Sequence, residues 1–196
     1  MKKLEFGWFL PTAGDSTAYG LPEASVDADS EYFERVITAA ENAGFTYLLI
    51  PVAEQCWEAY ITGAFMAAQS SKISMLIAAR PGYVNPVLLA KMIATFDQLS
   101  GGRICVNLIA GQAELEIKAE GITYEKEDRY ALMEEEVSIM KALWTAQEPL
   151  HFSGKYHNIS GARISPKPAQ SPHPKFYLGG GSEEAWNLSA KHYDVH

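Results

Sequence analysis

The sequence predicts an α/β fold in which parallel strands form a sheet or barrel covered by helices. Strand-like and helix-like segments alternate along nearly the whole chain. Most of the strand-like segments are almost continuous in apolar residues, as expected where both faces of a strand are buried. In the stretch from Lys175 to Ala190, a short strand runs directly into Gly179-Gly180-Gly181-Ser182 and then into a helical pattern. Such repeated βα units are typical of a parallel architecture.

The first half of the chain contains three such units. Ser30 is the expected N-cap of the first helix and Gly44 ends it. Asn85-Pro86 opens the third helix, with proline at a first-turn position, and Gly101-Gly102 stops it. The predicted segments are strands at 4–10, 45–50 and 73–79 and helices at 30–43, 58–69 and 86–100.

The second half continues the pattern after one interruption. A strand at 104–110 precedes a long helix at 128–144, whose apolar stripe comprises Leu132, Val137, Met140, Leu143 and Trp144. Residues 149–174 then read as an insertion, with a hairpin at 151–156 and an extended connection at 166–174. A fifth strand at 175–178 leads into the glycine-rich turn and its helix, and a sixth strand is expected to begin at 192–196.

An eight-stranded barrel typically needs about 250 residues or more. The 196 residues supply five βα units and the start of a sixth. Either the chain is a fragment, or its exposed edge is closed in another way, for example by a partner chain. An open edge and uncovered apolar core favour association. We therefore expect a homo-oligomer of at least two chains.

The bulk composition excludes several classes of function. A net charge of −8 and a pI near 5.1 argue against nucleic-acid and membrane-surface binding, which usually require a basic patch. No apolar run approaches the roughly 18 residues that a membrane span needs. Two cysteines, Cys56 and Cys105, are too few for a disulfide framework, so a reducing cytoplasm is the expected location. Cys105, inside a strand, is expected in the core.

The glycine-rich turn has the chemistry of an anion site. Glycines let the backbone come close to a ligand, and Ser182 is a good N-cap. The free N–H groups of the following helix turn would face a ligand beyond the strand, and phosphate suits them. An ordinary strand-to-helix turn or a Gly-Ser linker remains the alternative on this segment alone.

Three ordered blocks carry a resemblance that spans the whole chain. They are Asn85-Pro86 with Leu99-Ser100-Gly101-Gly102-Arg103 and Asn107; Asp128-Arg129-Tyr130; and Phe152-Ser153-Gly154 with the two Pro-X-Pro stretches and Gly179–Ser182. Together they resemble the bacterial luciferase-like superfamily of flavin-dependent monooxygenases. Trp8-Phe9-Leu10-Pro11-Thr12 and Leu49-Ile50-Pro51 with Cys56 are similar to the alkanesulfonate monooxygenase group.

The resemblance implies a TIM-type (β/α)8 barrel, present here as about its first five βα units plus the insertion. Residues 1–196 would then be one domain, truncated at the sixth strand. A separate reductase would deliver reduced FMN, which activates O₂ to release sulfite and an aldehyde from an alkanesulfonate. A sulfone or another small substrate, or a non-catalytic partial barrel that binds flavin, are the alternatives. A deazaflavin in place of FMN also stays open.

The resemblance also assigns residues to the FMN phosphate. Ser182 and the Gly181 amide would hold it, with Arg129 and Tyr130 nearby, since a guanidinium suits a dianion. Without the resemblance, Arg129 would be a solvated residue in the first turn of a helix.

A second set would contact the flavin ring. Asn107 would hydrogen-bond the isoalloxazine edge, and Glu116 lies at a flavin-contacting position, although a solvated loop carboxylate is the alternative. Ala79 follows Ala78 where relatives often carry a cis non-prolyl peptide bond against the flavin. The backbone groups of Val52 and Ala53 would line the same pocket.

Cys56 follows the second strand, where the alkanesulfonate enzymes carry a cysteine near the flavin, so the resemblance makes it the catalytic candidate; a small buried hydrophobe is the alternative. Lys126 stands where relatives usually have histidine, and Ala13 replaces a residue that is histidine in the alkanesulfonate enzymes. The family's sulfonate-binding arginines and its catalytic His and Tyr lie in the second half of the barrel. His196 matches none of them, and the histidines show no metal-ligand spacing.

Overall fold

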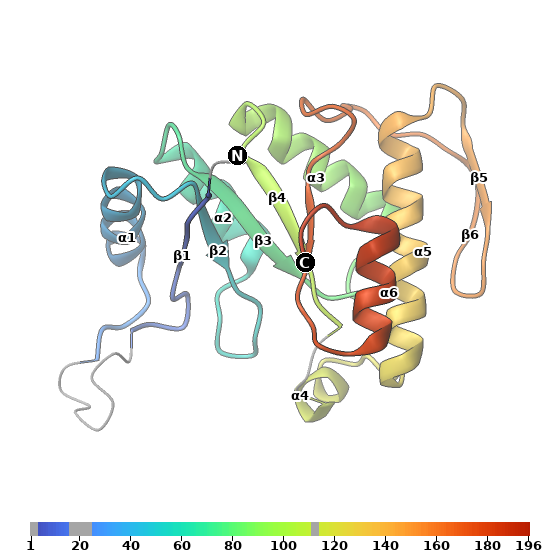
Figure 1. The fold of residues 1–196 in the computed structure, drawn as a ribbon, viewed down its shortest axis with the longest axis horizontal. Coiled ribbons are helices and arrows are strands. Elements are labelled where there is room, and N and C mark those ends of the chain that lie inside the picture. The colour runs from blue at the N-terminus through green and yellow to red at the C-terminus, as the bar shows by residue number, and fades with distance from the viewer. Residues whose placement is uncertain (1–3, 16–24, 111–113) are drawn as a thin grey trace. The chain divides into compact units, whose positions relative to one another are not determined.

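A computed structural model of the chain describes residues 4–15, 25–110 and 114–196 (Figure 1). The chain forms two compact units, residues 1–78 and 79–196. Both units are built from parallel strands and helices, so the predicted α/β class is confirmed.

The first unit contains three parallel strands. Tyr47 of β2 lies opposite Gly7 of β1 on one side and Ser74 of β3 on the other. Leu48 and Ile50 on β2 are fully buried, while the residues between them are only half-buried. The elements are β1 (Gly7–Phe9), α1 (Ser30–Asn42), β2 (Tyr47–Ile50), α2 (Ala59–Ala68) and β3 (Ser74–Ala79), whose last residue opens the second unit.

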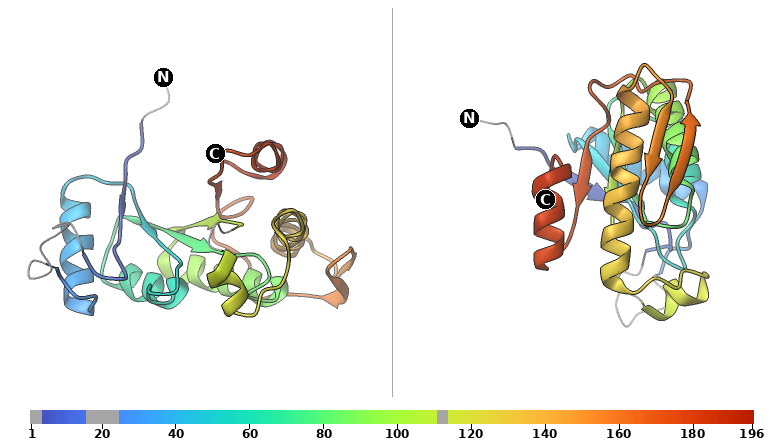
Figure 2. Two further views of the ribbon diagram at one scale, coloured as in Figure 1. Left: turned by 90° about the horizontal axis from the view of Figure 1, so that it is seen from below. Right: turned by 90° about the vertical axis from the view of Figure 1, so that its right-hand side faces the viewer.

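The second unit pairs β4 with β7 in parallel, with Val106 opposite Phe176. Its elements are α3 (Pro86–Ser100), β4 (Ile104–Leu108), α4 (Glu114–Ala119), α5 (Lys126–Thr145), β5 (Leu150–Ser153), β6 (Asn158–Ala162), β7 (Phe176–Leu178) and α6 (Glu183–His192). Helix α5 lies between α6 on one side and the β5–β6 hairpin on the other (Figures 1 and 2).

Local signals explain where these helices begin and end. The Asn85 side chain accepts a hydrogen bond from Val87 N at 3.0 Å, and Pro86 occupies the first turn of α3. Gly101 closes α3 in the left-handed conformation, with φ of 68°. The predicted apolar stripe of α5 is buried throughout. Its Trp144 stacks on Phe176 of β7, with ring centroids 5.6 Å apart.

The predicted hairpin is confirmed, and its turn is attached to α5. The Glu135 carboxylate accepts hydrogen bonds from the backbone N–H groups of Lys155, Tyr156 and His157. Asp128, two helical turns earlier, accepts from Lys155 Nζ at 2.7 Å and from the Tyr156 hydroxyl at 2.6 Å. The turn, rather than the strands, therefore makes the polar contacts of the hairpin with α5.

Four predictions from the sequence need correction. The N-cap of α1 is Asp29 rather than Ser30, because its carboxylate accepts from Tyr32 N at 2.7 Å. Helix α5 begins at Lys126, two residues earlier than predicted, and the short helix α4 was expected to be a loop. The expected sixth strand begins later than His192: His192 ends α6, and Val195 makes an isolated parallel bridge with Tyr177 of β7.

Within residues 4–15, 25–110 and 114–196, no helix combines the length and apolar character that crossing a bilayer requires.

Candidate functional site

The carboxyl ends of the strands in the second unit meet at one edge. Ile109, just after β4, donates its N–H to the Ala79 carbonyl at 2.9 Å, so the end of β3 lies beside the end of β4. Leu178, at the end of β7, lies opposite Leu108. Ligands of parallel α/β folds bind at this edge, because the loops that follow the strands gather there.

The glycine-rich turn follows β7 at this edge and ends in a capped helix. The Ser182 hydroxyl accepts from Ala185 N at 3.3 Å, as an N-cap does. A Cβ atom at Gly180 would lie 2.8 Å from the Ala185 Cβ, so the turn cannot hold a side chain there. Gly179 and Gly181 face open space instead. In the described parts of the chain, the N–H groups of Gly181 and Ser182 have no protein acceptor.

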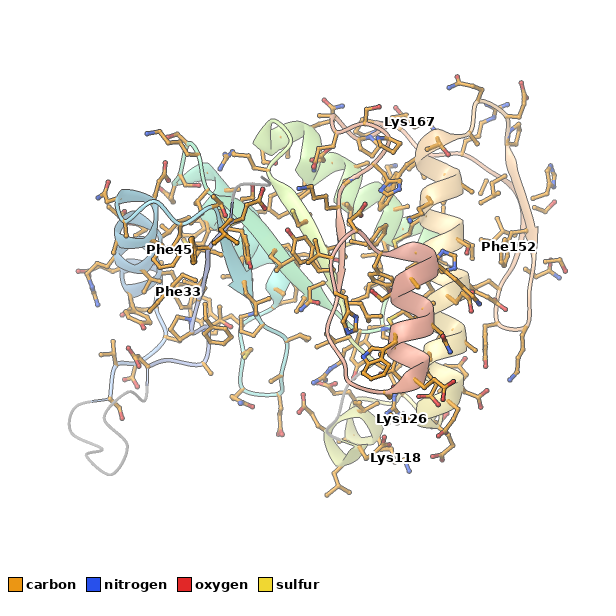
Figure 3. The ribbon with its side chains drawn as sticks, in the orientation of Figure 1. Phe33, Phe45, Lys118, Lys126, Phe152 and Lys167 are labelled. Carbon is orange, nitrogen blue, oxygen red and sulfur yellow. The ribbon has the colours of Figure 1, made fainter. Side chains whose placement is uncertain are left out.

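Two residues of α5 approach the turn. The Tyr130 hydroxyl lies 3.5 Å from the point where a Gly180 Cβ would be, so the structure brings Tyr130 beside the turn as predicted. Lys126 lies one helical turn earlier than Tyr130, near the first turn of α6 (Figure 3). The pKa of Glu184 is lowered by its own backbone N–H, by the Ser182 hydroxyl and by the Lys126 ammonium group. The turn thus has N–H donors, a phenol and a cation within reach.

Arg129 is placed elsewhere. It is 1% exposed, and its Nε donates to the Ala110 carbonyl at 2.8 Å. Its Nη1 donates to the Tyr124 carbonyl at 2.8 Å, and its Nη2 pairs with Glu114 at 2.5 Å. The hydrogen bonds that Arg129 donates to the Glu114 carboxylate hold the pKa of Glu114 below its usual range. In this structure Arg129 ties the end of β4, α4 and the loop before α5 together, and its contact with a phosphate stays a prediction.

Glu116 lies in α4 and pairs with an arginine that sequence reasoning missed. Arg80 directly follows β3, is buried, and binds Glu116 at 2.6 Å and Glu120 at 2.8 Å. The Tyr83 hydroxyl also donates to Glu120. The signal was available, because a cation straight after an apolar strand at its carboxyl end needs a partner.

Asn107 in β4 and Ala79 at the end of β3 both belong to the second unit, and their contacts with the flavin ring stay predictions. Asn107 is opposite Tyr177, and both are half-buried. Since neighbours in a strand point to opposite faces, Asn107 and Tyr177 lie on the face away from Val106 and Phe176, which pack toward α5. The expected cis bond between Ala78 and Ala79 is absent. The cis bonds of the described residues are Ser165–Pro166 and Ser171–Pro172, both before proline, where such bonds normally occur.

Val52, Ala53 and Cys56 belong to the first unit and follow β2. Cys56 N donates to the Ala53 carbonyl at 3.0 Å, which makes a tight turn of this segment. All three are half-buried, and the Cys56 thiol is free. Their flavin contacts stay predictions. Cys105 is buried in β4, as predicted.

A second residue missed from the sequence is Glu136 on α5. It is 1% exposed, and burial raises its pKa to about 7, against the opposing effect of a hydrogen bond from Gly82 N. The signal was its position, because Glu136 occupies the same helical face as the buried Leu132, Met133 and Met140. Among the described residues, no group of three or more His, Cys, Asp or Glu side chains is arranged to hold a metal ion.

Comparison with known proteins identifies a family and several solved structures with a similar fold. A family model described as luciferase-like monooxygenase matches residues 4–196. The EDTA monooxygenase EmoA from Chelativorans sp. BNC1 is similar, with a TM-score of 0.87 and 17% identity over 99% of this chain and 55% of that one.

Two further solved structures show the same fold with different cofactors in their descriptions. Riboflavin lyase RcaE, solved with modified FMN and riboflavin, has a TM-score of 0.81 and 19% identity over 99% of this chain and 54% of its own. An F420-dependent secondary alcohol dehydrogenase, solved with an F420–acetone adduct, has a TM-score of 0.77 and 20% identity over 99% of this chain and 58% of its own. The chain thus spans a little more than half the length of the structures it matches.

Proposed function

Because the chain belongs to the luciferase-like monooxygenase family, we propose that it forms part of a flavin-dependent monooxygenase that uses reduced FMN and O₂. The observation that carries this proposal is the turn from Gly179 to Ser182, with unpaired N–H groups at the start of α6 and the Tyr130 hydroxyl beside it. These groups suit a phosphate monoester, because N–H donors and the positive end of the helix dipole stabilise a dianion.

The groups around the turn have the chemistry that binds a phosphate. Gly181 and Ser182 would supply N–H donors, Tyr130 its hydroxyl, and Lys126 a compact cation near the same helix end. Asn107, on the face of β4 away from α5, would then hydrogen-bond the ring edge. When bound, reduced FMN supplies the reaction with O₂, and the chain's part is to bind and orient it.

For the substrate we propose an alkanesulfonate, oxidised to an aldehyde with release of sulfite, and for the partners a separate flavin reductase and a second copy of this chain. What supports the substrate is the sequence similarity around Trp8–Thr12 and Cys56 to the alkanesulfonate group. A sulfonate also requires a cationic clamp of arginine or lysine side chains. Sulfite release from an alkanesulfonate, but not from a neutral sulfone, would support this choice.

The proposal is tested by anaerobic titration of the protein with reduced FMN and with reduced riboflavin, which lacks the phosphate. FMN should bind at least tenfold more tightly, since charge-assisted hydrogen bonds contribute about 1.5 kcal/mol or more. Tyr130→Phe and Lys126→Met should reduce that ratio, because each removes a side-chain group proposed to stabilise the phosphate. Ser160→Ala, at an exposed position of β6, is the matched control.

Riboflavin is the internal reference for folding, because a variant that merely loosens α6 should weaken both ligands equally. Equal affinity of the unaltered protein for FMN and riboflavin would refute the phosphate site. Preferential binding of reduced F420 would replace FMN as the cofactor while leaving the site in place.

A further inference from the structure

Glu136 is a buried carboxylate that the proposed flavin chemistry does not use. It lies near the middle of α5, and its Oε1 accepts a hydrogen bond from Gly82 N at 2.9 Å. On the hairpin side, His157 Nε2 lies 3.8 Å from the same oxygen, while His157 Nδ1 lies 3.4 Å from Glu135. One carboxylate thus stands between the loop that follows β3 and the turn of the hairpin.

Two buried oxygen atoms in this region lack hydrogen-bond partners. Glu136 Oε2 has none in the described structure, nor does the Tyr193 hydroxyl, which follows α6. Burial and the charges of Glu136, Glu134 and Tyr130 raise the pKa of Tyr193. A buried polar atom without a partner is costly, and a site that tolerates one commonly serves a function.

The loop that Glu136 holds leads directly to the ligand edge. Gly82 has φ of +85°, and a Cβ there would lie 3.1 Å from Leu132 Cδ2, so the loop packs closely against α5. Two residues before Gly82, Arg80 binds Glu116 and Glu120 of α4. Gly82 and Arg80 therefore belong to one short loop, which binds α5 through Gly82 and α4 through Arg80.

We propose that Glu136 is a proton-sensitive positioning residue, which holds the loop from Arg80 to Tyr83 more firmly when it is ionised than when it is neutral. The groups that face Glu136 are the Gly82 N–H from the loop, His157 from the hairpin turn, Tyr193 from the segment after α6, and Glu135 from α5 itself. The inference does not depend on the proposed cofactor.

The physical basis is the strength of a charge-assisted hydrogen bond. A carboxylate accepts from an N–H group more strongly than a carbonyl oxygen of a neutral acid does. Hydrogen bonds to charged groups contribute about 1 kcal/mol more than neutral ones, which is roughly a fivefold change in an equilibrium constant. Local opening that breaks the Gly82 hydrogen bond but leaves Glu136 buried should therefore occur about fivefold less often once Glu136 loses its proton.

The experiment is amide hydrogen exchange of the purified protein, followed at Gly82 and expressed as a protection factor at pH 5.5 and pH 8. Protection at Gly82 should rise about fivefold between the two pH values, and Glu136→Gln should abolish the rise. Glu134→Gln, a half-exposed carboxylate on the same helix, is the matched control and should leave the rise intact. A ¹³C-carboxyl NMR titration of the unaltered protein should place the Glu136 midpoint near 7.

A Gly82 protection factor that does not change with pH in the unaltered protein would overturn the proposal. So would the same rise in Glu136→Gln as in the unaltered protein, or a Glu136 midpoint near the ordinary 4.5. The protection factors of the unaltered protein at the two pH values need no variant, so they test the proposal even if Glu136→Gln does not fold.

Discussion

Replacing Arg129 by methionine should destabilise the protein by about 2–4 kcal/mol. The substitution removes the donor to the Ala110 carbonyl, which is buried, and an unpaired buried carbonyl costs about 1–3 kcal/mol. It also removes the donor to the partly buried Tyr124 carbonyl and the partner of Glu114, whose side chain is 44% exposed and can be hydrated. The desolvation cost of the guanidinium disappears with it, which offsets part of the loss.

A matched control is Arg163→Met in the same unit. Arg163 pairs with Glu148 at 3.5 Å, but the two side chains are 60% and 89% exposed. An exposed pair of this kind contributes less than about 1 kcal/mol. Urea unfolding of both variants at pH 7, with the m-values compared, measures the difference.

A loss of stability in Arg129→Met no larger than in Arg163→Met would contradict the structural role of Arg129. In that case the hydrogen bonds of Arg129 would be replaceable by water, and its burial would not mark a structural role. Arg129→Lys should fall near Arg129→Met, because one ammonium group cannot reach three separate partners as the planar guanidinium does.

Three further outcomes are expected. The folded pKa of Glu136, about 7, lies above its unfolded value of 4.5, so the free energy of unfolding should fall by about 3 kcal/mol as the pH rises from 4.5 to about 7. Urea unfolding of Glu136→Gln should not show this fall, and the same pH dependence in the variant and the unaltered protein would contradict the prediction. Gly180→Ala should lower the melting temperature and weaken FMN binding, because its methyl group would collide with Ala185. Gly179→Ala should do neither, because a methyl group there faces open space, and equal effects of the two variants would contradict the turn geometry. Sedimentation velocity should show at least a dimer that Trp8→Gln, at a 55% exposed position on β1, shifts toward monomer; a monomer at every concentration would refute it.

The predictable parts of the fold are the elements whose ends are marked by local capping and turn residues. Asn85-Pro86, Gly101 and Ser182 mark helix ends through backbone chemistry that depends on a few neighbouring residues, and all three behave as expected. The strand β7 and its glycine-rich turn were recognisable for the same reason. Short elements without such signals, such as α4, were not.

The site was predictable in part, because sequence does not say which face of a helix is buried. Arg129 and Tyr130 are adjacent, yet successive helix residues point about 100° apart. Tyr130 therefore meets the glycine-rich turn, while Arg129 points to the end of β4. Arg80 and Glu136 were missed because their partners, in α4 and in the loop after β3, are distant in sequence.

The attachment of the hairpin has a consequence for how this protein can change through evolution. Its turn is bound by two carboxylates of α5, Asp128 and Glu135, mostly through backbone N–H groups that any sequence but proline provides. The strands β5 and β6 pair mainly with each other. Adding or removing residues in both strands would move the turn away from Glu135, and the hydrogen bonds between them would be lost. The length of the hairpin is therefore fixed by how far Glu135 lies from the end of α5. The side chains on the outer face of the hairpin can vary.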